Sequence, residues 1–233
     1  MHIFISDAHI RTDNSYRAKM LLAFLREFES KISSLFILGD MFEFWFEYNI
    51  VFPKHYFKTL ASLYNLIQNK KPVHYILGNH EVTIGNFFKN FGFIIHKNSA
   101  LLDIDGKKVF LCHGHRLDRR IWTVLWEHIL NSRINHKLYT LLHPDIGVFL
   151  AQGIAYLSRK QRRSPNAARL LENYARTQLQ NCDIVFLGHS HIPVFKKFPH
   201  NKYYVNTGDW IDHFSYGVID RGKVSLEYYK HRV

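Results

Sequence analysis

The chain has 233 residues, of which 47% are hydrophobic, and it carries a formal net charge of +12. That hydrophobic fraction is typical of a globular protein and argues against wholesale disorder, and no apolar run reaches the roughly 18 residues needed to cross a bilayer. The positive charge predicts an anionic partner, and nucleic acid, a phosphorylated metabolite and an acidic membrane surface all remain open.

The N-terminal stretch MHIFISDAHI has no basic leader, long apolar run or small-residue cleavage site, so no signal peptide is expected. Cys112 and Cys182 lie far apart without CxxC spacing and are expected to be reduced and buried. These features indicate a cytosolic protein.

Short apolar segments that end in polar, often glycine-containing turns recur along the chain, and each predicts a buried strand. They are HIFIS (2–6), SLFILGD (34–40), VHYILGNH (73–80), KVFLCHGH (108–115) and DIVFLGHS (183–190). Helical spacing predicts two amphipathic helices between the first three strands. Their apolar stripes are Tyr16, Met20, Leu21, Phe24, Leu25 and Phe28 and, after Pro53, Tyr56, Leu60, Leu63, Tyr64 and Ile67. This alternation predicts an α/β layered fold.

Residues 118–181 interrupt the alternation with helical patterns and no strand candidate. We interpret them as a helical insertion, or lid, in an α/β core formed by residues 1–117 and 182–233. Its basic cluster is Arg159, Lys160, Arg162, Arg163 and Arg169. After it, the alternating segments PVFKKF, KYYVNTG, FSYGVID and KVSLEYYK predict short antiparallel strands.

Side chains that can bind metals follow each of the five predicted core strands. In chain order they are Asp7, His9, Asp40, Asn79, His80, His113, His115, His189 and His191. A lone histidine is usually structural and a lone Gly-Asp is usually a turn, but five such strand ends are hard to assign to chance. They are expected to converge, because ligands bind outside the carboxyl ends of strands in open α/β sheets. The mixed ligands suit Mn, Fe, Zn or Co, and their number suits two ions that share a carboxylate.

The motifs D-x-H, GD, GNHE, HGH and GHxH, in this order, resemble those of the calcineurin-like metallophosphoesterase superfamily over nearly the whole chain. The resemblance implies a four-layer α-β-β-α sandwich and two divalent ions, with Mn²⁺ preferred and Fe or Zn as alternatives. One ion would be held by Asp7, His9, Asp40 and His191, and the other by Asp40, Asn79, His113 and His189. Asp40 would bridge the ions, a hydroxide between them would attack phosphorus, and His80 would lie near the leaving-group or transferred phosphoryl oxygens.

Three further stretches narrow the substrate. GDMFEFWFEY (39–48), VFPK (51–54) and LHPDIGVFLAQGIAYLSRKQR (142–162) resemble the branch that splits UDP-2,3-diacylglucosamine into UMP and 2,3-diacylglucosamine 1-phosphate in lipid A synthesis. In that branch the insertion caps the active site and holds the acyl chains. The resemblance implies apolar contacts from Trp122, Trp126, Phe149 and Tyr156, and polar contacts from Ser158, Arg159, Lys160, Arg163 and Asn166.

Other interpretations stay open. The aromatic residues alternatively form the insertion's own core, and the basic run a solvated helix face. Proteobacterial members have HGD where this chain has HGH, so His115 either supports the metal ligands or contacts substrate. They also have Arg after the GN, where His80 matches the general superfamily pattern.

The alternative function is a nuclease or nucleotide phosphodiesterase on the same metal site. Nucleic acid is disfavoured because basic residues do not alternate with aromatics along a strand platform, and a non-catalytic scaffold is disfavoured because no ligand is missing. We expect a cytoplasmic protein, peripheral on the inner membrane, whose basic insertion meets anionic lipids at about 1 kcal/mol per Lys or Arg. The pattern makes no prediction of oligomeric state.

Overall fold

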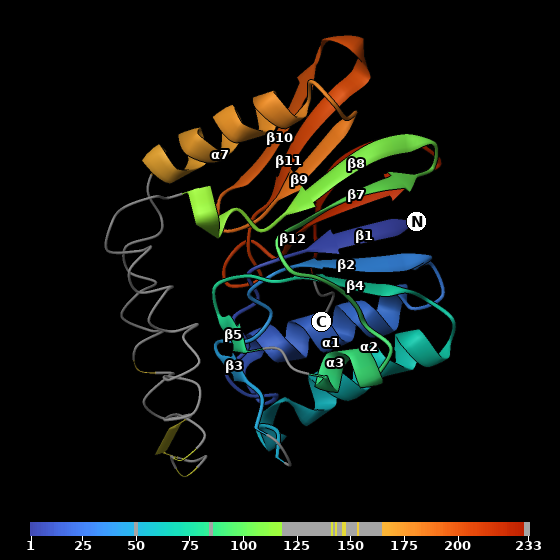
Figure 1. Cartoon of the computed structure of the whole chain (residues 1–233). Helices are drawn as coiled ribbons and strands as arrows, with labels where there is room; N and C mark the ends of the chain where they lie inside the picture. Colours follow the sequence, from blue (N-terminus) through green and yellow to red (C-terminus); the bar gives the residue numbers. More distant parts are fainter. Residues whose placement is uncertain are drawn as a thin grey trace.

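The computed structural model describes residues 1–48, 51–83, 86–117, 141, 143, 146–147, 153 and 165–230. Their strands form two main sheets that face each other (Figure 1). The first sheet, in spatial order, contains β13 (Lys223–Tyr228), β12 (Ser215–Asp220), β1 (His2–Ile5), β2 (Ser34–Leu38), β4 (Val73–Ile76) and β6 (Ile94–His96). The second contains β10 (Pro193–Phe198), β11 (Lys202–Thr207), β9 (Ile184–Leu187), β8 (Lys107–Cys112) and β7 (Ser99–Ile104). A short pair joins β3 (Trp45–Phe46) to β5 (Glu81–Thr83).

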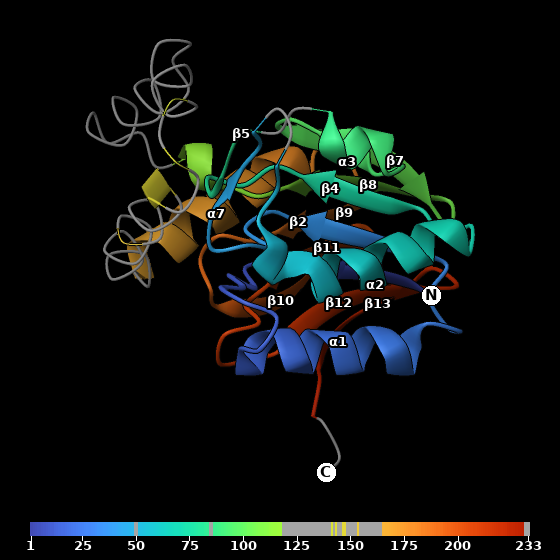
Figure 2. The same cartoon turned by 90° about the horizontal axis from the view of Figure 1, so that it is seen from below.

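Helices α1 (Tyr16–Phe28) and α2 (Phe57–Gln68) cover the outer face of the first sheet, and the short α3 (Phe87–Asn90) lies at its β6 side (Figure 2). The predicted stripe of α1 is buried at Met20, Leu21, Phe24 and Leu25. Ser15 caps this helix, since its hydroxyl accepts from the Ala18 amide. The two helices therefore have the positions and buried faces that their spacing predicts.

Two details of the helix predictions are wrong. Tyr16 is 66% exposed: it is the first residue of α1, and its ring packs edge-to-face on that of Phe214. Tyr64 is 37% exposed and packs on Phe91 after α3. Pro53 precedes a 3-10 turn over Lys54–Tyr56, and the α-helix begins one residue later.

The two sheets pack face to face through a core of large apolar side chains. At its centre the ring of Phe4 stacks on Phe36 at 4.7 Å and on Phe186 at 3.9 Å between centroids. Phe4 and Phe36 come from the first sheet and Phe186 comes from the second. Aromatic stacking thus joins the two middle layers.

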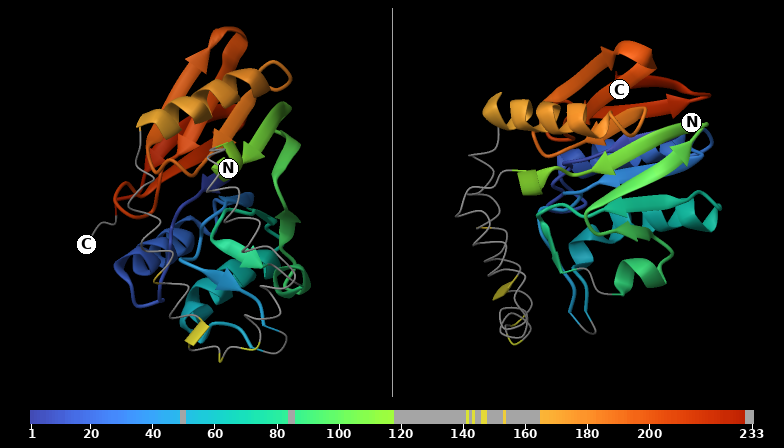
Figure 3. Two further views of the ribbon diagram at one scale, coloured as in Figure 1. Left: turned by 60° about the vertical axis from the view of Figure 1, so that its left-hand side comes forward. Right: turned by 45° about the horizontal axis from the view of Figure 1, so that its top comes forward.

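Helix α7 (Pro165–Gln178) forms the fourth layer, on the outer face of the second sheet (Figure 3). Its residues Leu171 and Ala175 pack against Val185, Leu187 and Tyr204 of the strands beneath. The four-layer α-β-β-α sandwich is confirmed.

α7 lies within the range 118–181 that the sequence assigns to the insertion, yet it packs on the core sheet because its apolar face matches that of β9 and β11. Most of residues 118–164 lie outside the described residues, so the lid itself stays a prediction. In the described part of the chain, no helix is both long and apolar enough to cross a membrane.

The predicted strands are confirmed, and β10 with β11 and β12 with β13 are antiparallel as expected. The prediction missed β3, β5, β6 and β7, and β7 forms a hairpin with the predicted β8. Its turn holds Asp105 at φ 51° and Gly106 at φ 72°, and an Asp-Gly pair with positive φ is a favoured two-residue hairpin turn. β7 was not predicted because Leu101 is an apolar residue on its exposed face, 57% accessible, so the strand lacks a clear alternation of apolar and polar residues.

Gly217 lies beside Phe4 in the sheet, and a Cβ there would overlap the ring of Phe186. We expect Gly217→Ala to lower the free energy of unfolding by about 1–3 kcal/mol through overpacking, measured by urea denaturation. The control is a double-mutant cycle with Phe186→Leu, which removes the ring. An equal cost of the alanine in both backgrounds would contradict this steric explanation.

Candidate metal centre

The predicted ligands converge where the carboxyl ends of β1, β2 and β4 meet those of β8 and β9. They come from both sheets, whereas the sequence argument placed them at the edge of one open sheet. Backbone hydrogen bonds join the loops, since Asp7 N donates to Gly39 O at 3.1 Å and Gly188 N donates to His113 O at 3.2 Å. Across the sheets, His189 N donates to Asp7 Oδ2 at 2.9 Å. The face-to-face packing of the sheets therefore creates the site.

The backbone is strained at these loops. Asp7, His9, Asp40, His189 and His191 all have left-handed φ, between 43° for His9 and 69° for His189. Non-glycine residues rarely adopt this region, and its cost of about 1–3 kcal/mol each is typically found at functional sites. The strained turns aim short side chains into a common centre.

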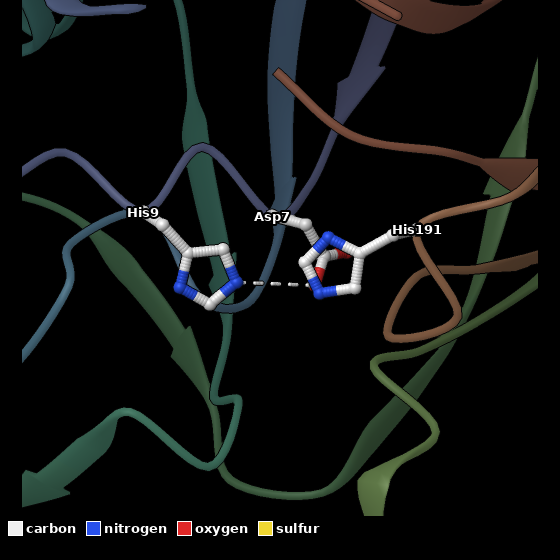
Figure 4. A group of neighbouring side chains, drawn as sticks. All are labelled: Asp7, His9 and His191. Atoms are coloured by element: carbon white, nitrogen blue, oxygen red, sulfur yellow. Dashed lines mark ion pairs between the residues drawn. The ribbon is translucent and has the colours of Figure 1, made fainter. Parts of the chain in front are cut away.

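Asp7, His9 and His191 form the first cluster, in which the potential ligand atoms all lie within 4.8 Å of one another. The two rings approach the Asp7 carboxylate from different sides (Figure 4). Asp7 Oδ1 lies 3.8 Å from His9 Nε2 and 3.6 Å from His191 Nε2. Asp7 Oδ1 and both ring nitrogens of His9 are buried without hydrogen-bond partners. Such polar atoms are costly, and a cation would satisfy them.

Asp40 lies at the centre of two further clusters, one with His9 and His80 and one with Asp7 and His113. Its Oδ2 lies 3.4 Å from His113 Nε2, 3.7 Å from His9 Nε2 and 3.8 Å from His80 Nε2. Its Oδ1 accepts from the His80 amide at 3.0 Å. This position between clusters fits a carboxylate shared by two ions.

His113 and His80 both turn Nε2 toward Asp40. His113 Nδ1 donates to Leu38 O at 2.6 Å, and His80 Nδ1 donates to Glu43 O. Because the carbonyl oxygens can only accept, each Nδ1 carries a proton and each Nε2 is the nitrogen that faces the centre. Imidazoles oriented in this way are common metal ligands, and they bind the metal through Nε2 once it is deprotonated.

The electrostatics of the centre favour ionised carboxylates. Burial raises the pKa of Asp7, but His191 and His9 outweigh it and lower that pKa to about 2. Burial opposes the ionised form of Asp40 as well, yet His113 and His80 hold its pKa well below the ordinary value. Burial lowers the pKa of His113, but Asp40 more than compensates and raises it to about 9. A buried anionic centre surrounded by imidazoles suits a divalent cation.

The other predicted site residues are placed less centrally. Within the part of the chain that the structure describes, His189 belongs to none of the three clusters, and its ring lies 5.1 Å from that of His113. Asn79 is half-buried after β4. His115 is buried, with its ring 5.4 Å from that of His113, and Asn166 is exposed near the start of α7. The remaining predictions fall outside the described residues: Trp122, Trp126, Phe149, Tyr156, Ser158, Arg159, Lys160 and Arg163.

Sequence reasoning missed Glu81, the last residue of GNHE. Its buried carboxylate accepts from the Asp40 amide at 3.1 Å, the Gly78 amide at 2.8 Å and the Tyr75 hydroxyl at 2.8 Å. Burial, with Asp40 nearby, raises its pKa to about 7. Glu81 thus joins the ends of β2 and β4, and its place directly after predicted ligands was the available signal.

Gly78 allows the ends of β2 and β4 to approach each other closely. A Cβ on Gly78 would overlap Asp40 Oδ1. Only glycine lets the turn after β4 pass this close to the central carboxylate. The glycine of GNHE is therefore explained by close approach.

Residues 3–193 match the model of the calcineurin-like phosphoesterase family. Curated relatives named UDP-2,3-diacylglucosamine hydrolase include one from Porphyromonas gingivalis, 27% identical over 96% of this chain and 95% of its own. Another, from Shewanella piezotolerans, is 25% identical over 96% of each chain. Among solved structures, Chaetomium thermophilum Vps29 is 12% identical and covers 98% of this chain and 96% of its own, with a TM-score of 0.47. The family match spans most of the chain and includes the whole metal-ligand set, so the chain belongs to the calcineurin-like phosphoesterase family.

Proposed function

We propose that the protein hydrolyses the pyrophosphate of UDP-2,3-diacylglucosamine to UMP and 2,3-diacylglucosamine 1-phosphate, with two divalent ions, preferably Mn²⁺. Membership of the family makes it a metal-dependent hydrolase of phosphoester or pyrophosphate bonds. The observation that carries the proposal is the convergence of buried Asp and His clusters at the ends of strands from both sheets. The curated relatives, which match nearly the whole chain, support the choice of substrate.

In this proposal one ion is held by Asp7, His9, Asp40 and His191, and the other by Asp40, Asn79, His113 and His189. Asp7 Oδ1, His9 Nε2 and His113 Nε2 are buried without a hydrogen-bond partner, which supports these assignments. Two such ions supply a water of lowered pKa and neutralise charge on the phosphate oxygens.

His80 is buried against Asp40, with its Nε2 turned to the centre. We assign it a hydrogen bond to the transferred phosphoryl group or to the leaving oxygen. His115 lies next to His113 and orients this ligand or contacts substrate.

The substrate's lipid part is assigned to the predicted insertion, residues 118–181, from its sequence alone. Trp122, Trp126, Phe149 and Tyr156 would contact acyl chains, and Ser158, Arg159, Lys160, Arg163 and Asn166 would contact the polar headgroup. The net charge of +12 favours a peripheral position on the anionic cytoplasmic face of the inner membrane.

With MnCl₂, the purified protein is expected to release UMP from UDP-2,3-diacylglucosamine, and EDTA should abolish the release until Mn²⁺ is restored. Asp40→Asn removes the carboxylate charge that the two ions would share. Turnover should fall by more than roughly 10- to 100-fold, which is the usual cost of losing a residue that only supports a metal ligand. UMP is measured by chromatography. The exposed Asp220→Asn, the same chemical change far from the centre, should match the wild type. Cleavage of bis-p-nitrophenyl phosphate or single-stranded DNA without action on the lipid would establish the alternative function.

Metal binding should release protons at pH 7. The pKa of about 9 for His113 means that its imidazole is protonated there before metal binds, and a ligand must lose that proton. Mn²⁺ affinity should therefore fall as the pH decreases. Calorimetric titrations in buffers of different ionisation enthalpy measure the number of protons released. Zero protons together with pH-independent affinity would contradict a protonated His113 in the metal-free site.

Charge reversal at Arg159 and Lys160 should reduce turnover of the lipid substrate several-fold and leave bis-p-nitrophenyl phosphate hydrolysis unchanged, because only the lipid substrate reaches the lid. The matched control is charge reversal at Lys70 and Lys71, which precede β4 at the end opposite the site. Parallel steady-state assays on both substrates give the comparison. Equal losses on the two substrates would rule out the lid assignment.

A further inference from the structure

Asp209 is a fully buried carboxylate in the turn after β11, outside the predicted ligand set. Its Oδ2 lies 3.5 Å from His191 Nδ1. The other nitrogen of the same ring, Nε2, lies 3.6 Å from Asp7 Oδ1 in the first metal-binding cluster. The His191 ring therefore stands between a carboxylate of the centre and a carboxylate behind it.

The turn fixes the orientation of Asp209 independently of His191. Its Oδ1 accepts from the amides of Ile211 at 3.2 Å, Asp212 at 3.0 Å and His213 at 3.1 Å. The His213 ring lies 3.1 Å from the same oxygen. Because Oδ1 is occupied by these donors, Oδ2 is the oxygen that faces His191.

The strand end before Asp209 is tied to the loops of both sheets. Asn206 Nδ2 donates to Gly188 O at 2.8 Å, beside the loop that carries His189 and His191. On the other side, Trp210 N donates to Asp7 O at 3.2 Å. The Thr207 hydroxyl lies 2.7 Å from that of Ser6, next to Asp7. Residues 206–210 thus hold Asp209 in a defined position relative to both halves of the centre.

We propose that Asp209 is a positioning residue that keeps the His191 proton on Nδ1 and directs the Nε2 lone pair at the ion held with Asp7 and His9. The inference rests on the proposed metal centre. His113 and His80 direct their Nε2 atoms through hydrogen bonds to backbone carbonyls, whereas a side-chain carboxylate, that of Asp209, lies 3.5 Å from His191 Nδ1. A carboxylate behind a ligating imidazole orients the ring and increases its basicity. Asp209 therefore affects the affinity for the ion held by His191 and does not affect the affinity for the other ion.

Mn²⁺ titration of metal-free protein by calorimetry tests this inference. Asp209→Asn should weaken one of two binding steps by about 10- to 100-fold and leave the other step unchanged. Asp209→Ser is a second variant, since its hydroxyl can still accept from the turn amides while the carboxylate is lost. The matched control is Asp212→Asn, because Asp212 is exposed in the same turn and contributes its backbone amide. The melting temperature of each metal-free variant reports any general loss of structure.

A direct readout comes from the side-chain ¹⁵N signals of His191 in metal-free protein. The wild type should show the Nδ1-protonated form, and Asp209→Asn should shift the ring toward a mixture of tautomers. Unchanged His191 signals, or two Mn²⁺ steps of wild-type affinity in both Asp209 variants, would overturn the inference. Absence of Mn²⁺ binding by the wild type would instead contradict the proposed metal centre.

Discussion

The burial of two carboxylates at one point, Asp7 and Asp40, is the constraint on which the rest of the structure depends. Both are fully inaccessible, and burying an ionised carboxylate costs several kcal/mol unless opposite charge and hydrogen bonds compensate. His189 N donates to one carboxylate and His80 N to the other, and imidazoles surround both. Protonated imidazoles compensate the charge of these carboxylates, and the same side chains can bind a cation after they lose that proton.

The architecture supplies what the two carboxylates need. Parallel strands end at one edge of each sheet, and stacking of Phe4, Phe36 and Phe186 holds those two edges in register. Close approach then requires glycine at Gly78, and left-handed backbone at five predicted ligands. Packing of the surrounding core offsets the cost of this backbone strain. The same packing of the two sheets therefore stabilises the sandwich and sets the geometry of the metal centre.

Outer carboxylates complete the arrangement. Glu81 joins the ends of two neighbouring strands at Asp40, and Asp209, which follows β11, lies beside His191, which follows the adjacent strand β9. Each is held by backbone amides. The fold therefore fixes the orientation of both side chains.

By itself the sequence determined the strands that carry the metal-ligand candidates, the candidates themselves and the family, because apolar runs ending in Asp, Asn or His are local patterns. It also indicated α1 and α2, whose stripes are local too. Only the tertiary structure decided that ligands come from two facing sheets and that α7 covers the second. It alone revealed Asp209, which lies far along the chain from Asp7 yet beside it in space. Such contacts depend on sheet packing and on hydrogen bonds between distant loops, and no local spacing encodes them.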